Sequence, residues 1–295
     1  MTVLVIGEAL VDVVQRDGVD PEPHAGGSPF NVAVGLARLD VPTQLATQLA
    51  PDAYGALLRE RLDESGVMLS SLEPVPDHTS SASATLAADG SASYVFDLTW
   101  NPEQLPDPGQ FEAVHVGSLG TSLEPGARLV ADLVVSADAL GIPVSYDPNV
   151  RLAVEPDAAV WRRVFETIVP YASIVKLSDE DAAVLFPGEK PHDLARRLSS
   201  ERGLVAVTVG GEGAVLSATG AAASIKAPAI EVVDTIGAGD SFMAAMLAWC
   251  AVYSWPSAAE LDLTELTDLA AYAAMAAAIT CSRPGADPPR SADLH

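Results

Sequence analysis

Short apolar runs alternate along the chain with longer segments in which apolar residues recur every three or four positions. The short runs predict buried strands, and the longer segments predict helices packed on a sheet. The expected strands are 3–6, 10–14, 113–116, 143–146, 174–177 and 205–209, and a further extended apolar run occupies 230–233. The expected helices are 52–64, 125–140, 157–169, 191–201, 240–252 and 266–280, with one more that starts at 28–29. This alternation predicts an α/β fold with a doubly wound, mostly parallel sheet flanked by helices.

Two of the expected helices carry signals at their ends. Ser28 followed by Pro29 predicts a helix start, with the serine as the N-cap and the proline at the first helical position. Gly66 stands just beyond the helix expected at 52–64, where a glycine in the left-handed conformation commonly ends a helix.

The period of the pattern changes to two between residues 79 and 98. Asp89 and Gly90 separate two alternating runs there, which is a strong hairpin signal. The hairpin is short and polar on one face, so we expect it to lie outside the main sheet. Together with an early strand near 11–16 it should form a small β-sheet lid, built from about 10–24 and 76–100. No repeat or low-complexity linker divides the chain, and we expect one domain over 1–295.

Composition and charge restrict the partners and the compartment. A formal charge of −24 over 295 residues argues against nucleic acid or an anionic membrane as a partner, because both repel an acidic protein. Such acidity is typical of a highly soluble protein or of adaptation to high salt. The two cysteines lack CxxC spacing, which favours free thiols in a reducing compartment. The N-terminus lacks the features of a signal peptide and no apolar run approaches roughly 18 residues, so we expect a cytoplasmic protein.

The string DTIGAGDSF at 234–242 carries the clearest chemistry. Gly237, Ala238 and Gly239 let successive backbone N–H groups converge into an anion-binding nest at the start of a helix. Asp240 lies beside that nest, where the positive end of the helix dipole keeps a carboxylate ionised and able to accept a proton from a hydroxyl. Taken alone, the same residues also fit a tight turn in which Asp240 only caps the helix.

A second glycine-rich string, AGGSPFNVA, occupies 25–33. Gly26 and Gly27 permit close approach of the backbone to a ligand, and Asn31 offers both a donor and an acceptor. The alternative is a glycine turn that feeds a helix whose asparagine faces solvent.

The two strings, in this order and this far apart, resemble the signatures of the PfkB/ribokinase-type carbohydrate kinases, and the resemblance extends over essentially the whole chain. It implies a ribokinase-like fold and ATP-dependent phosphorylation of a sugar. By the same resemblance Asp240 is the catalytic base and residues 237–239 form the anion hole. Gly26, Gly27 and Asn31 match residues that bind sugar hydroxyls, and Asp12 matches the family's sugar-binding aspartate.

Shorter strings resemble the fructokinase-like members of that family. They are DPNVR at 147–151, VTVGGEG at 207–213 and TCSRPGA at 280–286. The resemblance implies that Thr208, Gly210 and Gly213 hold ATP, and that Lys176 lies near its phosphates. The family's Asn-x-x-Glu string, which organises Mg²⁺ through water, is replaced by Ser178-Asp179-Glu180-Asp181, so Asp181 takes the place of the glutamate, with Glu180 as the competing assignment. Many relatives bind K⁺ through backbone carbonyls, at positions matched by Asp234, Ile236, Thr280 and Gly285.

Substrate choice stays open at this stage. The DPNVR string favours fructose, but Arg151 also suits the carboxylate of 2-keto-3-deoxygluconate, and ribose is a further option. A sugar-binding regulatory protein without catalysis is the non-enzyme alternative, which the intact GAGD string disfavours. An NAD-dependent dehydrogenase is weaker still, because no GxGxxG follows the first strand. Relatives often dimerise through lid strands, so we expect a homodimer.

Overall fold

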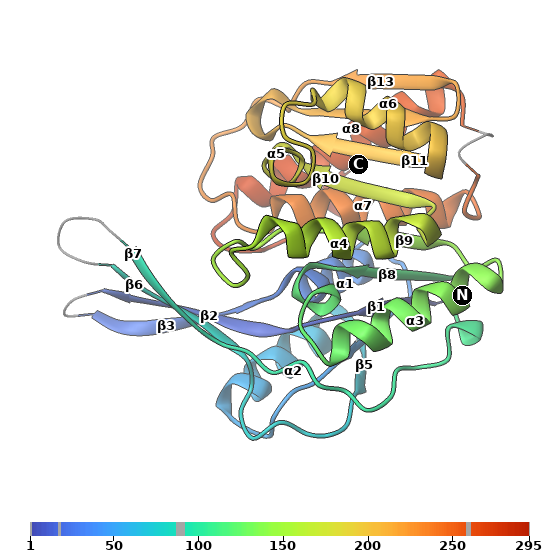
Figure 1. Ribbon diagram of the computed structural model, residues 1–295. Coiled ribbons are helices and arrows are strands. Elements are labelled where there is room, and N and C mark those ends of the chain that lie inside the picture. The colour runs from blue at the N-terminus through green and yellow to red at the C-terminus, as the bar shows by residue number, and fades with distance from the viewer. Residues whose placement is uncertain (1, 17–18, 87–91, 258–260, 295) are drawn as a thin grey trace.

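The computed structural model describes residues 2–16, 19–86, 92–257 and 261–294. Over these ranges, nine strands form one sheet in the order β13-β12-β11-β10-β9-β8-β1-β4-β5 (Figure 1). The strands are β1 Val3–Ile6, β4 Thr43–Thr47, β5 Met68–Ser71, β8 Ala113–Gly117, β9 Val144–Asp147, β10 Ile174–Ser178, β11 Leu204–Thr208, β12 Ala214–Ala218 and β13 Ala221–Ile225. The pairs from β5 to β11 are parallel, and β12 and β13 are antiparallel additions at one edge.

Helices cover both faces of this sheet. They are α1 Ser28–Arg38, α2 Ala53–Ser65, α3 Gly126–Ala139, α4 Ala158–Ile168, α5 Asp179–Leu185, α6 Pro191–Arg202, α7 Ala238–Val252 and α8 Leu263–Cys281. One buried cluster joins one face of the sheet to α1, α2, α7 and α8, and a second joins the other face to α3, α4, α5 and α6. The predicted α/β fold, with a mostly parallel sheet flanked by helices, is therefore confirmed.

A second, four-stranded sheet projects from this body (Figure 1). Its strands are β2 Leu10–Arg16, β3 Val19–Gly26, β6 Ser81–Leu86 and β7 Ala92–Asp97, in the order β3-β2-β6-β7. The predicted hairpin is the antiparallel pair of β6 and β7. Its expected turn at Asp89 and Gly90 lies outside the described residues.

The predicted start of α1 is wrong by one residue. Gly27 is the N-cap, without a side-chain cap, and Ser28 is the first helical residue. The Ser28 hydroxyl does not cap α1, because it donates a hydrogen bond to a side chain of α7. The caps of α2 agree with expectation, since Asp52 accepts from the Gly55 N–H and Gly66 is left-handed with φ 79°.

The apolar run at 230–233 joins no sheet. Val232 and Val233 are 61% and 59% exposed. The Val233 and Asp234 N–H groups instead donate to the Cys281 carbonyl, at 2.8 and 3.2 Å. Within the described ranges, no helix combines the length and apolarity needed to cross a membrane.

Candidate active site

The start of α7 forms a glycine-rich turn at the carboxyl edge of the main sheet. Gly237 is its N-cap in the left-handed conformation, with φ 74°. A Cβ there would lie 2.7 Å from the Ala286 Cβ, and a Cβ at Gly239 would lie 2.8 Å from the Lys176 Nζ. The left-handed φ favours glycine at 237, and a side chain at 239 would have to displace the Lys176 ammonium. The Ala238 N–H donates to the Thr235 carbonyl at 3.3 Å, whereas the N–H groups of Gly239 and Asp240 lie in the first helical turn, where an anion can bind.

Asp240 lies in the first turn of α7 and is 7% exposed. Its Oδ1 accepts from the Ser28 hydroxyl at 2.6 Å and from the Asn149 Nδ2 at 3.4 Å. Its Oδ2 accepts from the Asn31 Nδ2 at 2.8 Å. The carboxylate thus has donors from α1 and from the loop after β9, and Gly237, not Asp240, is the N-cap of α7.

The predicted sugar-binding residues assemble beside this carboxylate. A Cβ at Gly26 would overlap with the Asp12 Oδ2, and a Cβ at Gly27 would lie 2.8 Å from the Glu8 carbonyl oxygen. Burial raises the pKa of Asp12, although the charges of Arg151 and His24 oppose this and that of Asp240 adds to it. Asp12, Gly26, Gly27 and Asn31 therefore line one region that adjoins Asp240.

The loop after β9 brings Asn149 and Arg151 to the same region. Val150 is fixed by its N–H, which donates to the Asp181 Oδ1 at 2.7 Å. Arg151 is exposed, and its guanidinium donates to the Val150 carbonyl at 3.2 Å. Its positive charge lowers the pKa values of both Asp12 and Glu8 against the larger effect of their burial.

Lys176 is buried beneath the nest. Its Nζ donates to the Asp147 Oδ2 at 2.9 Å, and the two side chains are 4% and 0% exposed. Burial alone would lower the pKa of Lys176, but Asp147, Asp181 and Asp240 outweigh burial and raise it. Burial raises the pKa of Asp147 to about 6, with Lys176 opposing the shift. The ammonium therefore places a fixed positive charge next to Gly239.

Asp181 is 5% exposed and holds two loops together. Besides Val150, it accepts at Oδ2 from the Ser178 N–H and hydroxyl, at 2.8 and 2.7 Å, in a capping box at the start of α5. Glu180, the competing assignment, is exposed. In the described residues, no group of three or more His, Cys, Asp or Glu side chains is arranged to hold a metal ion.

The predicted ATP-binding loop follows β11, at the same sheet edge. Thr208 pairs with Ser178 in the register of β11 and β10, and its hydroxyl donates to the Leu177 carbonyl at 3.4 Å. Gly210 and Gly213 have φ values of 46° and 110°, and they bracket a single 3₁₀ turn. These left-handed positions favour glycine.

The residues matched to the K⁺ site lie in two loops joined through Asp234. Its Oδ1 accepts from the Ile236 N–H at 3.0 Å, and its Oδ2 accepts from the Gly285 N–H at 2.9 Å. Thr280 is fully buried near the end of α8. The two segments that would supply backbone carbonyls to a cation therefore adjoin each other and the Gly237 turn.

The interpretation of the sequence missed Glu8. This residue follows β1, is 3% exposed and accepts from the Gly120 N–H at 2.7 Å. Burial raises the pKa of Glu8 to about 7, against hydrogen bonds from Ser118 and Gly120 and the charge of Arg151. The available signal was a carboxylate placed directly after a buried strand, at the edge where ligands of such sheets bind.

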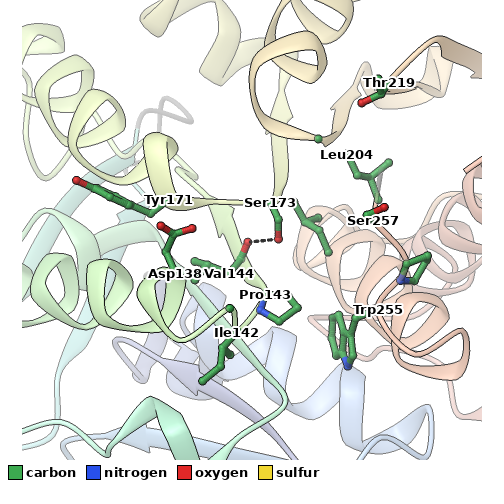
Figure 2. Close-up of a pocket in the computed structure, with 14 residues that line it drawn as sticks. Asp138, Ile142, Pro143, Val144, Tyr171, Ser173, Leu204, Thr219, Trp255 and Ser257 are labelled. Carbon is green, nitrogen blue, oxygen red and sulfur yellow. Dashed lines mark hydrogen bonds between the residues drawn. The ribbon is translucent and has the colours of Figure 1, made fainter. Parts of the chain in front are cut away.

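A cleft of about 420 Å³ lies at the opposite ends of the strands, where the parallel strands begin (Figure 2). Val144, Ile174 and Leu204, the first residues of β9, β10 and β11, line it together with Trp255. None of the predicted site residues contributes to its lining. The chemistry suggested by the motifs therefore concentrates at the carboxyl edge and not in this cleft.

Comparison with known proteins identifies the family. The pfkB family carbohydrate kinase model matches residues 2–293. The fructokinase of Rhizobium leguminosarum bv. trifolii is 33% identical over 259 residues, which cover 83% of this chain and 78% of that protein. The structure of fructokinase with bound ATP from Xylella fastidiosa is 25% identical, with a TM-score of 0.81 and coverage of 99% of this chain and 96% of the other.

A further structure similar in fold is a double mutant of fructokinase from Vibrio cholerae O395 in a fructose-, ADP- and potassium-bound form. It is 23% identical, with a TM-score of 0.82 and coverage of 99% of this chain and 96% of the other. The fold is thus ribokinase-like, as predicted, with a mostly parallel main sheet and a smaller second sheet. This chain belongs to the pfkB family of carbohydrate kinases and is a sugar kinase.

Proposed function

We propose that this sugar kinase transfers the γ-phosphoryl group of ATP to a primary hydroxyl of fructose. The observation that carries the proposal is the position of Asp240, which lies between the glycine turn of α7 and the cluster formed by Asp12, Gly26, Gly27 and Asn31. One carboxylate thus adjoins both a place for an anion and a place for a polyhydroxyl compound.

The roles of the residues follow from this arrangement. Asp240 takes the proton from the hydroxyl that attacks the γ-phosphorus. The N–H groups of residues 237–239 and the buried Lys176 stabilise the negative charge that develops on the transferred group. Asp12, Asn31 and the 26–27 backbone hold the sugar hydroxyls, and the lid at about 10–24 and 76–100 excludes water.

Charge favours a neutral sugar over a sugar acid. Arg151 is the cation in the loop after β9 that would pair with a substrate carboxylate, but its charge already acts on the buried carboxyls of Asp12 and Glu8. Asp240 adds a third acidic group to the same region. A substrate carboxylate would therefore compete with the carboxyls of Asp12 and Asp240 for Arg151, which supports fructose and disfavours 2-keto-3-deoxygluconate. Ribose is also neutral and stays the second candidate.

ATP, Mg²⁺ and K⁺ are the cofactors of this proposal. Thr208, Gly210 and Gly213 would hold the nucleotide, and the similar Xylella kinase binds ATP. Both oxygens of Asp181 already accept hydrogen bonds, so its geometry suits a metal held through water better than one bound directly. Mg²⁺ there would neutralise charge on the phosphates. The loops joined by Asp234 fit a K⁺ site, and the Vibrio fructokinase is in a potassium-bound form.

Homodimerisation through the lid and a cytoplasmic location stay predictions. The exposed Val95 on β7, an edge strand of the lid sheet, is compatible with a partner at that edge.

A coupled ADP-release assay tests the substrate. With ATP, Mg²⁺ and K⁺, the panel is fructose, ribose, 2-keto-3-deoxygluconate, glucose and adenosine, and we expect the highest kcat/KM for fructose. A preference for 2-keto-3-deoxygluconate would overturn the charge argument. A folded chain that phosphorylates none of these compounds and does not bind ATP would move the non-catalytic, sugar-binding alternative to the front.

A further inference from the structure

The first turns of helices α1 and α7 meet at the Asp240 carboxylate. Ser28 and Asn31, in the first turn of α1, each donate to its carboxylate, and Asp240 itself lies in the first turn of α7. Each helix starts after a glycine N-cap that provides no side-chain cap. The positive ends of two helix dipoles therefore meet at one carboxylate.

The Ser28 hydroxyl is committed to this carboxylate. Ser28 is 6% exposed, and its Oγ lies 2.6 Å from the Asp240 Oδ1, across 212 residues of sequence. Hydrogen bonds to a carboxylate are short and strong when the oxygen is ionised. The hydroxyl does not cap its own helix, because Gly27 occupies the N-cap position. Its function is thus not explained by the formation of α1.

The two oxygens of Asp240 have different surroundings. Oδ1 accepts from Ser28 and, at 3.4 Å, from Asn149, so both of its lone-pair directions are used. Oδ2 accepts only from Asn31 among the described residues, and Asn31 belongs to the proposed sugar cluster. Oδ2 therefore lies on the side of the proposed sugar cluster and retains a free lone pair.

We propose that Ser28 is a positioning residue for the phosphoryl transfer, which fixes the Asp240 Oδ1 and leaves Oδ2 as the oxygen that takes the proton. The inference rests on the proposed role of Asp240 as the base. In the step, the sugar O–H bond breaks and its proton moves to Oδ2. The sugar oxygen bonds to the γ-phosphorus, the bond from that phosphorus to the β–γ bridging oxygen breaks, and ADP leaves. Ser28 keeps its proton throughout.

Ser28→Ala removes the donor and leaves Oδ1 with the long contact to Asn149. The lost hydrogen bond stabilised the ionised carboxylate, so the acid limb of the pH profile of kcat should move to higher pH. We expect kcat at neutral pH to fall on the order of 10- to 100-fold, with little change in the KM for ATP.

Other charged groups act on Asp240 and remain in place in the variant. They are Lys176 on β10, Asp147 on β9 and Asp12 on β2. The shift between wild type and Ser28→Ala therefore reports Ser28 alone. Ser28→Thr restores a hydroxyl and should recover most of kcat if its methyl group is accommodated.

Ser199→Ala is the matched control. Ser199 lies on α6 and is 3% exposed, and its hydroxyl forms a hydrogen bond of 2.9 Å with the hydroxyl of Ser217 on β12. This variant also loses a buried hydroxyl pair, but its pH profile should match that of wild type. Thermal unfolding of all variants verifies that each is folded.

The kinetics distinguish the possible results. A lower kcat with a displaced acid limb in Ser28→Ala, and not in Ser199→Ala, supports the positioning role. Equal kcat and equal pH profiles for the two variants would overturn it, as would a change confined to the KM for the sugar, which would make Ser28 a sugar ligand. Near-normal activity in Asp240→Asn would instead refute the proposed base, independently of Ser28.

Discussion

Replacing Glu8 by glutamine removes a buried carboxyl group of the site while keeping its size. The amide oxygen can still accept from the Gly120 N–H, which lies 2.7 Å from the Glu8 Oε2. The structure indicates that the change should alter how stability depends on pH. Burial raises the pKa of Glu8 from 4.5 to about 7.

The sign follows from proton linkage. In the folded chain Glu8 holds its proton to a higher pH than in the unfolded chain. Its contribution to the free energy of unfolding is therefore fully present below about pH 4.5 and is lost as the pH rises through about 7. The difference of 4.5 against about 7 corresponds to a loss of about 3 kcal/mol over this interval, at about 1.4 kcal/mol per pKa unit.

Urea unfolding of wild type and Glu8→Gln at about pH 5 and about pH 8 measures the effect. The free energy of unfolding of the variant, relative to wild type, should rise by about 2 to 3 kcal/mol between the two pH values. Other groups titrate in both proteins and cancel in the difference. Glu103→Gln, a change at an exposed carboxylate, should follow wild type at both pH values. An equal difference between wild type and Glu8→Gln at pH 5 and pH 8 would refute the reasoning.

Two further changes test the surroundings of the site. Gly26→Ala places a methyl group where the Asp12 carboxylate lies, so the KM for the sugar should rise about 10-fold or more while the KM for ATP stays constant. An unchanged KM for the sugar in steady-state kinetics would show that Asp12 does not bind the sugar. Lys176→Met leaves the fully buried Asp147 carboxylate without its partner and should lower the free energy of unfolding by about 3 to 5 kcal/mol. The control Lys226→Met, at an exposed lysine, should lower it little, and equal losses in urea unfolding would show that the buried pair contributes nothing.

The main body of the fold could be predicted because its strands are buried on both faces. Runs such as Val3–Ile6 and Leu204–Thr208 are almost entirely apolar, and the predicted helices start within about three residues of the expected positions. The short helix α5 was not predicted. Strands β4, β5, β12 and β13 were not predicted. Their sequences are polar or rich in Ala and Ser, and they form strands because neighbours in the sheet supply hydrogen bonds.

The missed and misplaced features of the site all depend on distant partners. Ser28 looks like an N-cap in sequence, but its hydroxyl bonds to Asp240, 212 residues away. Glu8 looks like an ordinary carboxylate after a strand until Gly120, 112 residues away, donates to it. The motifs at 25–33 and 234–242 were informative because each one is contiguous and carries its own backbone conformation.

The central claim is that Asp240 is the base of a kinase that phosphorylates a neutral sugar, and sugar-dependent ADP release by wild type and Asp240→Asn tests it most directly. With saturating ATP, Mg²⁺ and fructose, we predict turnover by wild type and a loss of kcat on the order of 10²- to 10⁴-fold in the variant, with thermal unfolding and ATP binding preserved. A folded Asp240→Asn enzyme that retains most of the wild-type kcat would contradict the account.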